Sequence, residues 1–223
     1  MQKQKRWFNT NSMNRNRAWH TASLLTTGNV LLCGDSGVAG DPCSAELYDP
    51  STKTWTLSGN MIHGRYYRTA SMLTNGKLLT TGRVSSSNPN SSELYDPSLG
   101  NWTILRNMNS ARWQHTASVL TNGKILVIGV TENWILTGSM NNTRGYRTAS
   151  VLMNGYVLVA GGYSTSSDVN SAALYDPLTG TWTITSTMNF TRWDHPTFVL
   201  TDGNVLISGG TSGDLALNVS EIY

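Results

Sequence analysis

One stretch of thirteen residues occurs three times in this chain, and it limits the possible folds more than any other feature. The copies read CSAELYDPSTKTW (43–55), NSSELYDPSLGNW (90–102) and NSAALYDPLTGTW (170–182). A wider register repeats five times, in which a tryptophan stands six residues before a methionine and an arginine four residues after it. The methionines are Met13, Met61, Met108, Met140 and Met188, separated by 48, 47, 32 and 48 residues. A recurrence in this range is typical of repeat proteins.

Each unit predicts four short antiparallel strands. The first, such as HTASVL (115–120), leads in four of the units through Asn-Gly or Asp-Gly into a second strand such as KILVIG (124–129). We expect two-residue hairpins here, because these dipeptides supply the positive φ values that such turns need. The second strand is apolar on both faces, so both faces must be covered. The SAELY segment predicts the third strand, Asp-Pro the next turn, and the tryptophan segment the fourth strand.

Four antiparallel strands repeated around an axis make a β-propeller, in which neighbouring sheets cover each other. The pattern resembles the kelch repeat over essentially the whole chain: an apolar second strand, a glycine pair, and a tyrosine and tryptophan seven positions apart. The full glycine pair is kept at Gly161-Gly162 and Gly209-Gly210. The expected fold is all-β, a kelch-type β-propeller of about five blades of four antiparallel strands. The third blade is expected to miss a strand, because residues 115–134 contain no ELYDP segment.

The domain prediction is a single propeller over residues 1–223. Its units lie near residues 13–60, 61–107, 108–139, 140–187 and 188–223. The last unit ends at Tyr223 in a third strand, while Trp7 stands where a fourth strand is expected. We therefore expect residues 1–12 to complete the last blade and close the ring, the closure that the kelch resemblance implies. Closure would leave no open sheet edge.

Composition and charge narrow the possible partners and compartments. Charged residues make up 13% of the chain and the formal net charge is +3, so neither nucleic acid nor a membrane surface is an expected partner. The basic N-terminus has no apolar stretch behind it, so we expect neither a signal peptide nor a membrane span. The expected location is the cytoplasm, or outside the cell if a signal peptide is missing from this chain. Cys33 and Cys43 allow two alternatives, free thiols or a disulfide across neighbouring strands.

Two sets of basic residues repeat at fixed positions. The first set opens the first strand of each unit and consists of His20, Arg68, His115, Arg147 and His195. It either hydrogen-bonds neighbouring inner strands or forms a basic ring at the channel mouth that binds an anionic ligand or an acidic peptide. The second set is the arginine four residues after each methionine. These arginines either satisfy loop carbonyls and carboxylates such as Glu46 and Glu93, or face a partner.

Aromatic residues stand next to these arginines, a combination typical of interface hot spots. We expect them on one propeller face, where they either pack or bind a protein. The candidate partner-binding residues are Arg17, Trp19, Arg65, Tyr67, Arg68, Arg112, Trp113, Arg144, Tyr146, Arg147, Arg192 and Trp193.

Enzyme signatures are missing: the chain has no Gly-x-Ser-x-Gly, no phosphate loop, no His-Glu-x-x-His and no cysteine pair with zinc spacing. Copper radical oxidases have kelch-like propellers, but neither Cys33 nor Cys43 lies in a recognisable version of their copper-site motif. The segment YDPLTGTW is similar to the sialidase Asp-box, although Asp176 and Trp182 are one residue too far apart. The sequence therefore predicts a monomeric, non-catalytic protein-interaction scaffold without cofactor or metal. The alternative is an extracellular kelch-like oxidase or carbohydrate-active enzyme.

Overall fold

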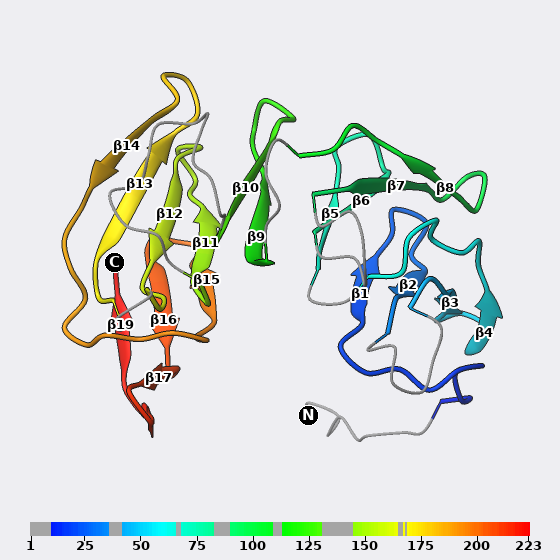
Figure 1. Cartoon of the computed structure of the whole chain (residues 1–223), viewed down its shortest axis with the longest axis horizontal. Coiled ribbons are helices and arrows are strands. Elements are labelled where there is room, and N and C mark those ends of the chain that lie inside the picture. The colour runs from blue at the N-terminus through cyan, green and yellow to red at the C-terminus, as the bar shows by residue number, and fades with distance from the viewer. Residues whose placement is uncertain are drawn as a thin grey trace, which may run out of the picture.

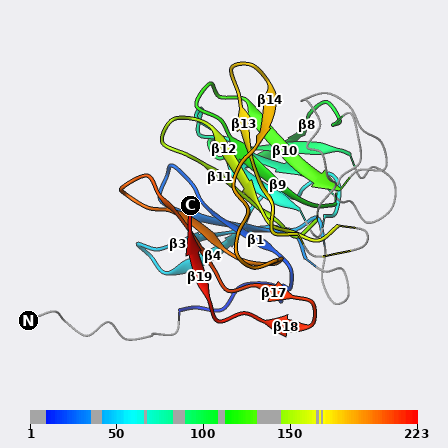
Figure 2. The ribbon, with the colours of Figure 1, turned by 90° about the vertical axis from the view of Figure 1, so that its left-hand side faces the viewer.

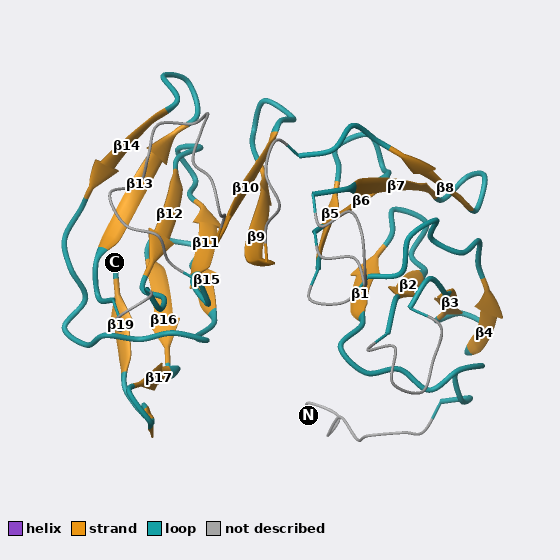
Figure 3. Cartoon of the chain, in the orientation of Figure 1, coloured by secondary structure: helices purple, strands orange, loops and turns teal. Residues whose placement is uncertain are grey.

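The protein is built from β-strands and the turns between them. The computed structural model describes residues 10–35, 42–65, 68–82, 90–108, 113–130, 145–164, 167 and 169–223. Every regular element among these residues is a strand, as Figure 3 shows. The all-β prediction is confirmed.

Three sheets have four strands each, hydrogen-bonded in chain order. The first sheet consists of β1 (Thr21–Leu24), β2 (Val30–Cys33), β3 (Ala45–Asp49) and β4 (Thr54–Leu57). The second consists of β5 (Thr69–Met72), β6 (Leu78–Thr81), β7 (Ser92–Asp96) and β8 (Asn101–Ile104). The third of these sheets, in the fourth unit, consists of β11 (Thr148–Val151), β12 (Val157–Ala160), β13 (Ala172–Asp176) and β14 (Thr181–Ile184). All their pairings are antiparallel, as predicted for a blade.

The third and fifth units form smaller sheets. The third unit has β9 (Trp113–Val119) and β10 (Ile125–Val130). The prediction that this blade lacks a strand concerns the residues after β10, and 131–144 lie outside the described residues. The fifth has β15 (Thr197–Val199), β16 (Val205–Ser208) and β19 (Ser220–Ile222), plus a hairpin of β17 (Thr211–Ser212) and β18 (Leu215–Ala216) that the repeat does not predict. Three described sheets reach four strands, so the prediction of about five four-stranded blades is met only in part.

The blades follow one another around a common axis. Their first strands lie next to each other in the order β1, β5, β9, β11, β15. Figure 1 shows the resulting arc, from β1–β4 at the lower right to β15–β19 at the lower left, and Figure 2 shows it from the side. Within the described residues, no strand pairing joins the first blade to the last. Residues 1–9 lie outside that description, so closure by residues 1–12 stays a prediction.

The hairpin loops between first and second strands differ from the predicted two-residue loops. In the second blade Leu73 N–H donates to the Lys77 carbonyl at 2.8 Å and Gly76 N–H donates to the Leu73 carbonyl at 3.0 Å. The loop therefore has three residues rather than two, and only Gly76, at φ 78°, has a positive φ. The geometry is a turn followed by one left-handed residue. Asn75 contributes its side chain instead, which accepts the Lys77 N–H at 3.1 Å.

The Asp-Pro turn is held by the aspartate side chain. The carboxylate of Asp176 accepts the backbone N–H of Leu178 at 2.8 Å, and Asp49 does the same for Ser51 at 2.8 Å. Such Asx contacts stabilise a turn locally. The Leu178 bond lowers the pKa of Asp176, and bonds from the Ser51 hydroxyl and then from its backbone N–H lower the pKa of Asp49. The segment similar to an Asp-box thus uses its aspartate to shape the turn between β13 and β14.

The repeated tyrosine and tryptophan pack against each other between the third and fourth strands. The ring centroids are 4.9 Å apart for Tyr48–Trp55 and 5.0 Å apart for Tyr95–Trp102. Trp102 is 7% exposed and belongs to the buried cluster that joins the first and second blades. Trp55, Trp102 and Trp182 thus pack within the scaffold. Cys33 lies inside the same cluster, and no disulfide joins it to Cys43.

Candidate partner-binding face

The linkers that enter the first strands are anchored by buried ion pairs. Arg65 Nη2 lies 2.9 Å from Glu93 Oε1, and both side chains are fully buried. The same guanidinium donates to the carbonyls of Gly82 at 2.8 Å and Ser91 at 2.9 Å. Glu93 also accepts the backbone N–H groups of Ile62 and His63. The pair therefore fastens a linker to the third strand of its blade.

Equivalent pairs anchor the first and last blades. Arg17 lies 2.8 Å from Glu46, and Arg192 lies 2.6 Å from Glu221, again with fully buried arginine side chains. Burial opposes ionisation of Glu46, but bonds from the Asn14 backbone and from Arg17 outweigh it and lower the pKa of the carboxyl. The assignment of Arg17, Arg65 and Arg192 as partner contacts is therefore corrected, because their donors are enclosed by the scaffold.

Four of the five residues that open the first strands are also buried, and Arg68, His115 and His195 connect neighbouring blades. Arg68 is 7% exposed and donates to the Arg65 carbonyl at 2.8 Å and to Thr21 Oγ1 of the first blade at 3.2 Å. His115 Nε2 lies 3.0 Å from Thr69 Oγ1 of the preceding blade. Arg147 is 4% exposed. Arg68 and Arg147 are thus corrected from partner contacts to scaffold residues.

His195 follows the same pattern in the last blade. It is 3% exposed, and its Nε2 lies 3.2 Å from Thr148 Oγ1 in the preceding blade. Burial lowers the pKa of His195 to about 4, with a smaller contribution from Arg192. Burial likewise lowers the pKa of His20. Burial therefore favours the neutral form of both imidazoles.

Aromatic side chains remain on the face that carries the linkers, here called the linker face. Trp19 is 58% exposed and Tyr146 is 41% exposed. Both occupy the position six residues after the repeat methionine, and both have a left-handed backbone, with φ of 55° and 49°. Asp194 holds the same position in the last unit with φ of 53°. A left-handed backbone conformation disfavours bulky residues, so an exposed aromatic side chain at this position does not stabilise the fold.

Tyr146 belongs to an aromatic cluster between the fourth and fifth units. Its ring centroid lies 5.4 Å from that of Trp193, which lies 6.4 Å from that of Tyr163. Tyr163 is 45% exposed. Backbone pairs position the cluster: Gly145 pairs with Tyr163, and Trp193 pairs with Thr211. Tyr163 is not among the residues predicted from the sequence; its place directly after the glycine pair is the sequence feature that points to it.

The remaining candidates are not placed. Tyr67, Arg112 and Arg144 lie outside the described residues, and Trp113 begins β9 but its side chain is not described. Of the twelve candidates, the structure brings Tyr146 and Trp193 together and leaves Trp19 exposed on a different blade. In the described residues, no three His, Cys, Asp or Glu side chains gather in a way that could hold a metal ion. Nor does the described part of the chain hold a helix that could span a membrane.

Comparison with known proteins agrees with this architecture. The kelch motif matches residues 144–189, which include the complete blade β11–β14. This is a kelch-type β-propeller. No curated protein matches the sequence of this kelch propeller.

Solved structures share the fold at low sequence identity. The structure of YjhT has a TM-score of 0.66 at 14% identity, with 98% of this chain and 84% of YjhT covered. A fungal alcohol oxidase of the AA5 family, in complex with copper, has a TM-score of 0.51 at 16% identity. That alignment covers 89% of this chain and 59% of the oxidase. At such identities the likeness concerns the fold alone.

Proposed function

We propose that this kelch propeller is a non-catalytic, monomeric interaction module that binds a protein partner through its linker face. The observation that carries the proposal is the pair Trp19 and Tyr146, exposed on left-handed backbone at the same repeat position. A glycine or asparagine would hold that conformation with less strain. Aromatic side chains retained there are better explained by contacts made outside the chain, since strained residues concentrate at functional positions.

The repeated residues fall into two groups, those bonded within the scaffold and those with exposed aromatic rings, and this contrast supports the proposal of a binding face. Arg65 and His115 bond within the scaffold. Trp19, Tyr146 and Tyr163 instead expose large amphipathic rings, the side chains that dominate protein interfaces. In the fourth unit, the loop after the second strand begins at Tyr163, which pairs with Gly145 of the linker, and loops on a rigid scaffold commonly carry binding residues.

Site-specific photo-crosslinking tests the proposal. A photoreactive phenylalanine analogue replaces Trp19 or Tyr146 in separate variants expressed in the source cells. Matched controls carry the analogue at Leu99 or Leu178, which are 70% and 91% exposed in the turns at the opposite edge of the blades. We expect one discrete protein adduct from both linker-face positions and none from the controls. Equal labelling of both edges would contradict a partner on the linker face.

The competing candidate is an oxidase, favoured by the fold shared with a copper-bound alcohol oxidase. Its test is independent of crosslinking. The purified chain is titrated with Cu²⁺ in a calorimeter and then assayed for peroxide with primary alcohols and sugars. Stoichiometric copper binding together with peroxide production would replace the interaction module by an oxidase. Heat changes no larger than those of an unrelated protein, without peroxide, are the result expected of the interaction module.

A further inference from the structure

Two tyrosine rings flank one indole in the aromatic cluster between the fourth and fifth units. The ring centroids of Tyr146 and Tyr163 lie 5.4 and 6.4 Å from that of Trp193. Their planes are tilted by 54° and 66° against the indole, so neither tyrosine lies flat on it. Tyr146 is 41% exposed and Tyr163 is 45% exposed. Rings at such angles let a group bound on the surface contact more than one aromatic face.

Backbone hydrogen bonds hold these rings in place. Gly145 N–H donates to the Tyr163 carbonyl at 2.8 Å, and Tyr163 N–H donates back to the Gly145 carbonyl at 2.9 Å. Trp193 is paired in the same way with β17. The Asp194 N–H donates to the Tyr146 carbonyl at 2.9 Å and so joins the two segments. A cluster that is fixed by its backbone loses little conformational freedom on binding, so it is preorganised for a ligand.

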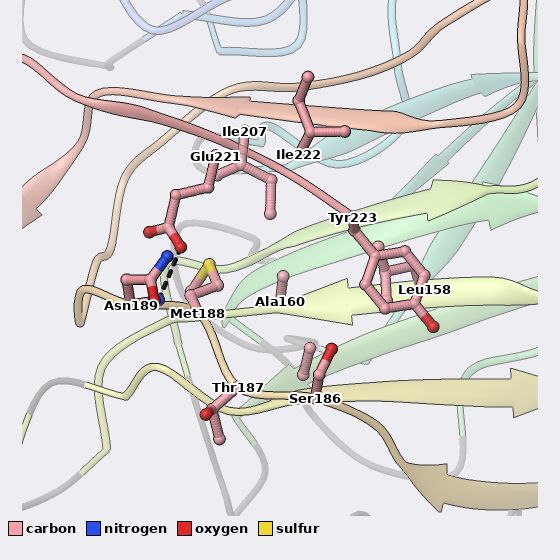
Figure 4. Close-up of a pocket in the computed structure, with 11 residues that line it drawn as sticks. Leu158, Ala160, Ser186, Thr187, Met188, Asn189, Ile207, Glu221, Ile222 and Tyr223 are labelled. Carbon is pink, nitrogen blue, oxygen red and sulfur yellow. Dashed lines mark hydrogen bonds between the residues drawn. The ribbon is translucent and has the colours of Figure 1, made fainter.

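The linker that leads to Trp193 is anchored as well. In the close-up of Figure 4, Glu221 accepts the backbone N–H of Asn189, at a distance of 2.6 Å. The same carboxylate lies 2.6 Å from Nη2 of Arg192, the residue before Trp193. Met188, which lines the cavity drawn in that figure, is 8% exposed and packs between the fourth and fifth blades. The indole therefore follows a segment that is fixed to its blade.

The charges around the cluster favour a cation. Among the described residues of the segments that carry it, both exposed charges are negative: Asp194 follows the indole residue directly, and Asp214 lies in the turn of the β17–β18 hairpin. The basic side chains of these segments are enclosed, since Arg147 is 4% exposed, Arg192 is 0% exposed and His195 is 3% exposed. Aromatic faces and carboxylates both attract positive charge.

Hydrogen bonding narrows the kind of cation. The carbonyls of Gly145, Tyr146, Tyr163 and Trp193 each accept a backbone N–H already. An unmodified lysine ammonium brings three donors, each of which needs an acceptor when it leaves water. A trimethylated ammonium carries the same charge without any N–H, so its methyl groups can lie against rings with no donor left unsatisfied.

We propose that the aromatic cluster binds a methylated lysine side chain of the protein partner. The inference rests on the proposed function, in which the linker face binds a protein, and it names the chemical group that this face recognises. The rings of Tyr146, Trp193 and Tyr163 contact the methyl groups, and the Asp194 carboxylate supplies the counter-charge.

A blocked trimethyllysine, acetylated at its N-terminus and amidated at its C-terminus, is the probe. It is titrated at millimolar concentration into the full chain while the NMR signals of the indole N–H groups are followed. We expect the signal that is missing from Trp193→Phe to shift on binding. The neutral analogue, with a tert-butyl group in place of the trimethylammonium group, is expected to bind at least about fivefold more weakly, and so is unmodified blocked lysine.

Two variants and a matched control locate the probe. Asp194→Asn removes the charge and keeps a side chain that tolerates a left-handed backbone, so it should weaken trimethyllysine binding by about two- to fivefold and leave the neutral analogue unaffected. Tyr163→Leu keeps apolar surface without an aromatic face and should weaken binding by a similar factor. Asp202→Asn removes the same charge at the other end of β15, where Asn75, Asn122 and Asn154 stand in other units, and should leave binding unchanged.

Three results would overturn the proposal, and they separate it from the proposed function. Equal affinity for the charged and neutral probes would make the cluster a general apolar contact. No binding of trimethyllysine, while photo-crosslinking still yields a protein adduct, would remove the methyllysine site and leave the interaction module standing. Binding of the probe without any protein adduct, together with sedimentation of the chain on phosphatidylcholine vesicles, would assign the site to a lipid headgroup and contradict a protein source.

Discussion

The buried ion pair in the second blade gives the sharpest stability prediction. Glu93→Gln keeps the size of the side chain but only one acceptor oxygen, whereas Glu93 uses one oxygen for the Ile62 N–H and the other for the His63 N–H and Arg65. It removes the negative charge 2.9 Å from Arg65 Nη2, in a place where both side chains are fully buried. The substitution therefore leaves the arginine charge without its counter-charge in the interior.

The expected cost follows from burial. Breaking a buried pair by removing one partner costs about 3–5 kcal/mol, because the remaining charge stays out of water. The whole stability of a domain is only about 5–15 kcal/mol, so this is a large fraction. The pair of Lys77 and Asp96 has a similar separation, 2.8 Å, but its side chains are 38% and 17% exposed. Breaking an exposed pair of this kind costs about 0–1 kcal/mol.

Urea unfolding followed by tryptophan fluorescence separates the two cases. With a slope of about 2–3 kcal/mol per molar urea, Glu93→Gln is expected to lower the midpoint by about 1.5 M. Lys77→Met, the matched control, is expected to lower it by less than about 0.5 M. Equal midpoints for the two variants, with unchanged slopes, would refute the claim that the buried pair fastens the linker to its blade.

Three further predictions concern other parts of the repeat. Because burial lowers the pKa of His195 to about 4, the stability it contributes is complete above pH 6.5 and lost as the pH falls toward 4; His195→Asn should flatten this part of a pH–Tm curve. A Cβ on Gly82 would collide with the His115 imidazole, so Gly82→Ala should cost several kcal/mol in urea unfolding, whereas Gly100→Ala, with open space around it, should cost about 1 kcal/mol. Trp19→Gly relieves a left-handed φ and should leave the unfolding free energy within about 1 kcal/mol of wild type by the same method.

The sequence predicts the blades well because their residues act locally and repeat. Spacing alone places Tyr48 opposite Trp55 and Tyr95 opposite Trp102, and the structure pairs both in register. The hairpin loops are less predictable, since Asn-Gly fits a two-residue turn and equally a three-residue turn in which only Gly76 is left-handed. The β17–β18 hairpin is not predictable from the repeat, because residues 211–216 differ in sequence from residues 163–168, which hold the same place in the fourth unit.

The candidate site was harder to predict, because a repeated arginine looks the same whether it is buried or exposed. Arg65 is enclosed by Glu93 and by carbonyls that come from elsewhere in the chain. The sequence suggested this pairing as one of two alternatives, and only the fold decides between them. Tyr163 reaches Trp193 through a pairing of distant backbone segments, which no local pattern reveals.

The central claim is that buried repeated residues hold the propeller together while exposed aromatics of the linker face bind a protein. The most direct measurement is the affinity of the partner identified by crosslinking, determined by calorimetry for wild type, Trp19→Gly and Leu178→Ser. We predict at least about tenfold weaker binding for Trp19→Gly, with Tm unchanged, and wild-type affinity for Leu178→Ser. Unchanged affinity in Trp19→Gly, or an equal loss in Leu178→Ser, would contradict the claim.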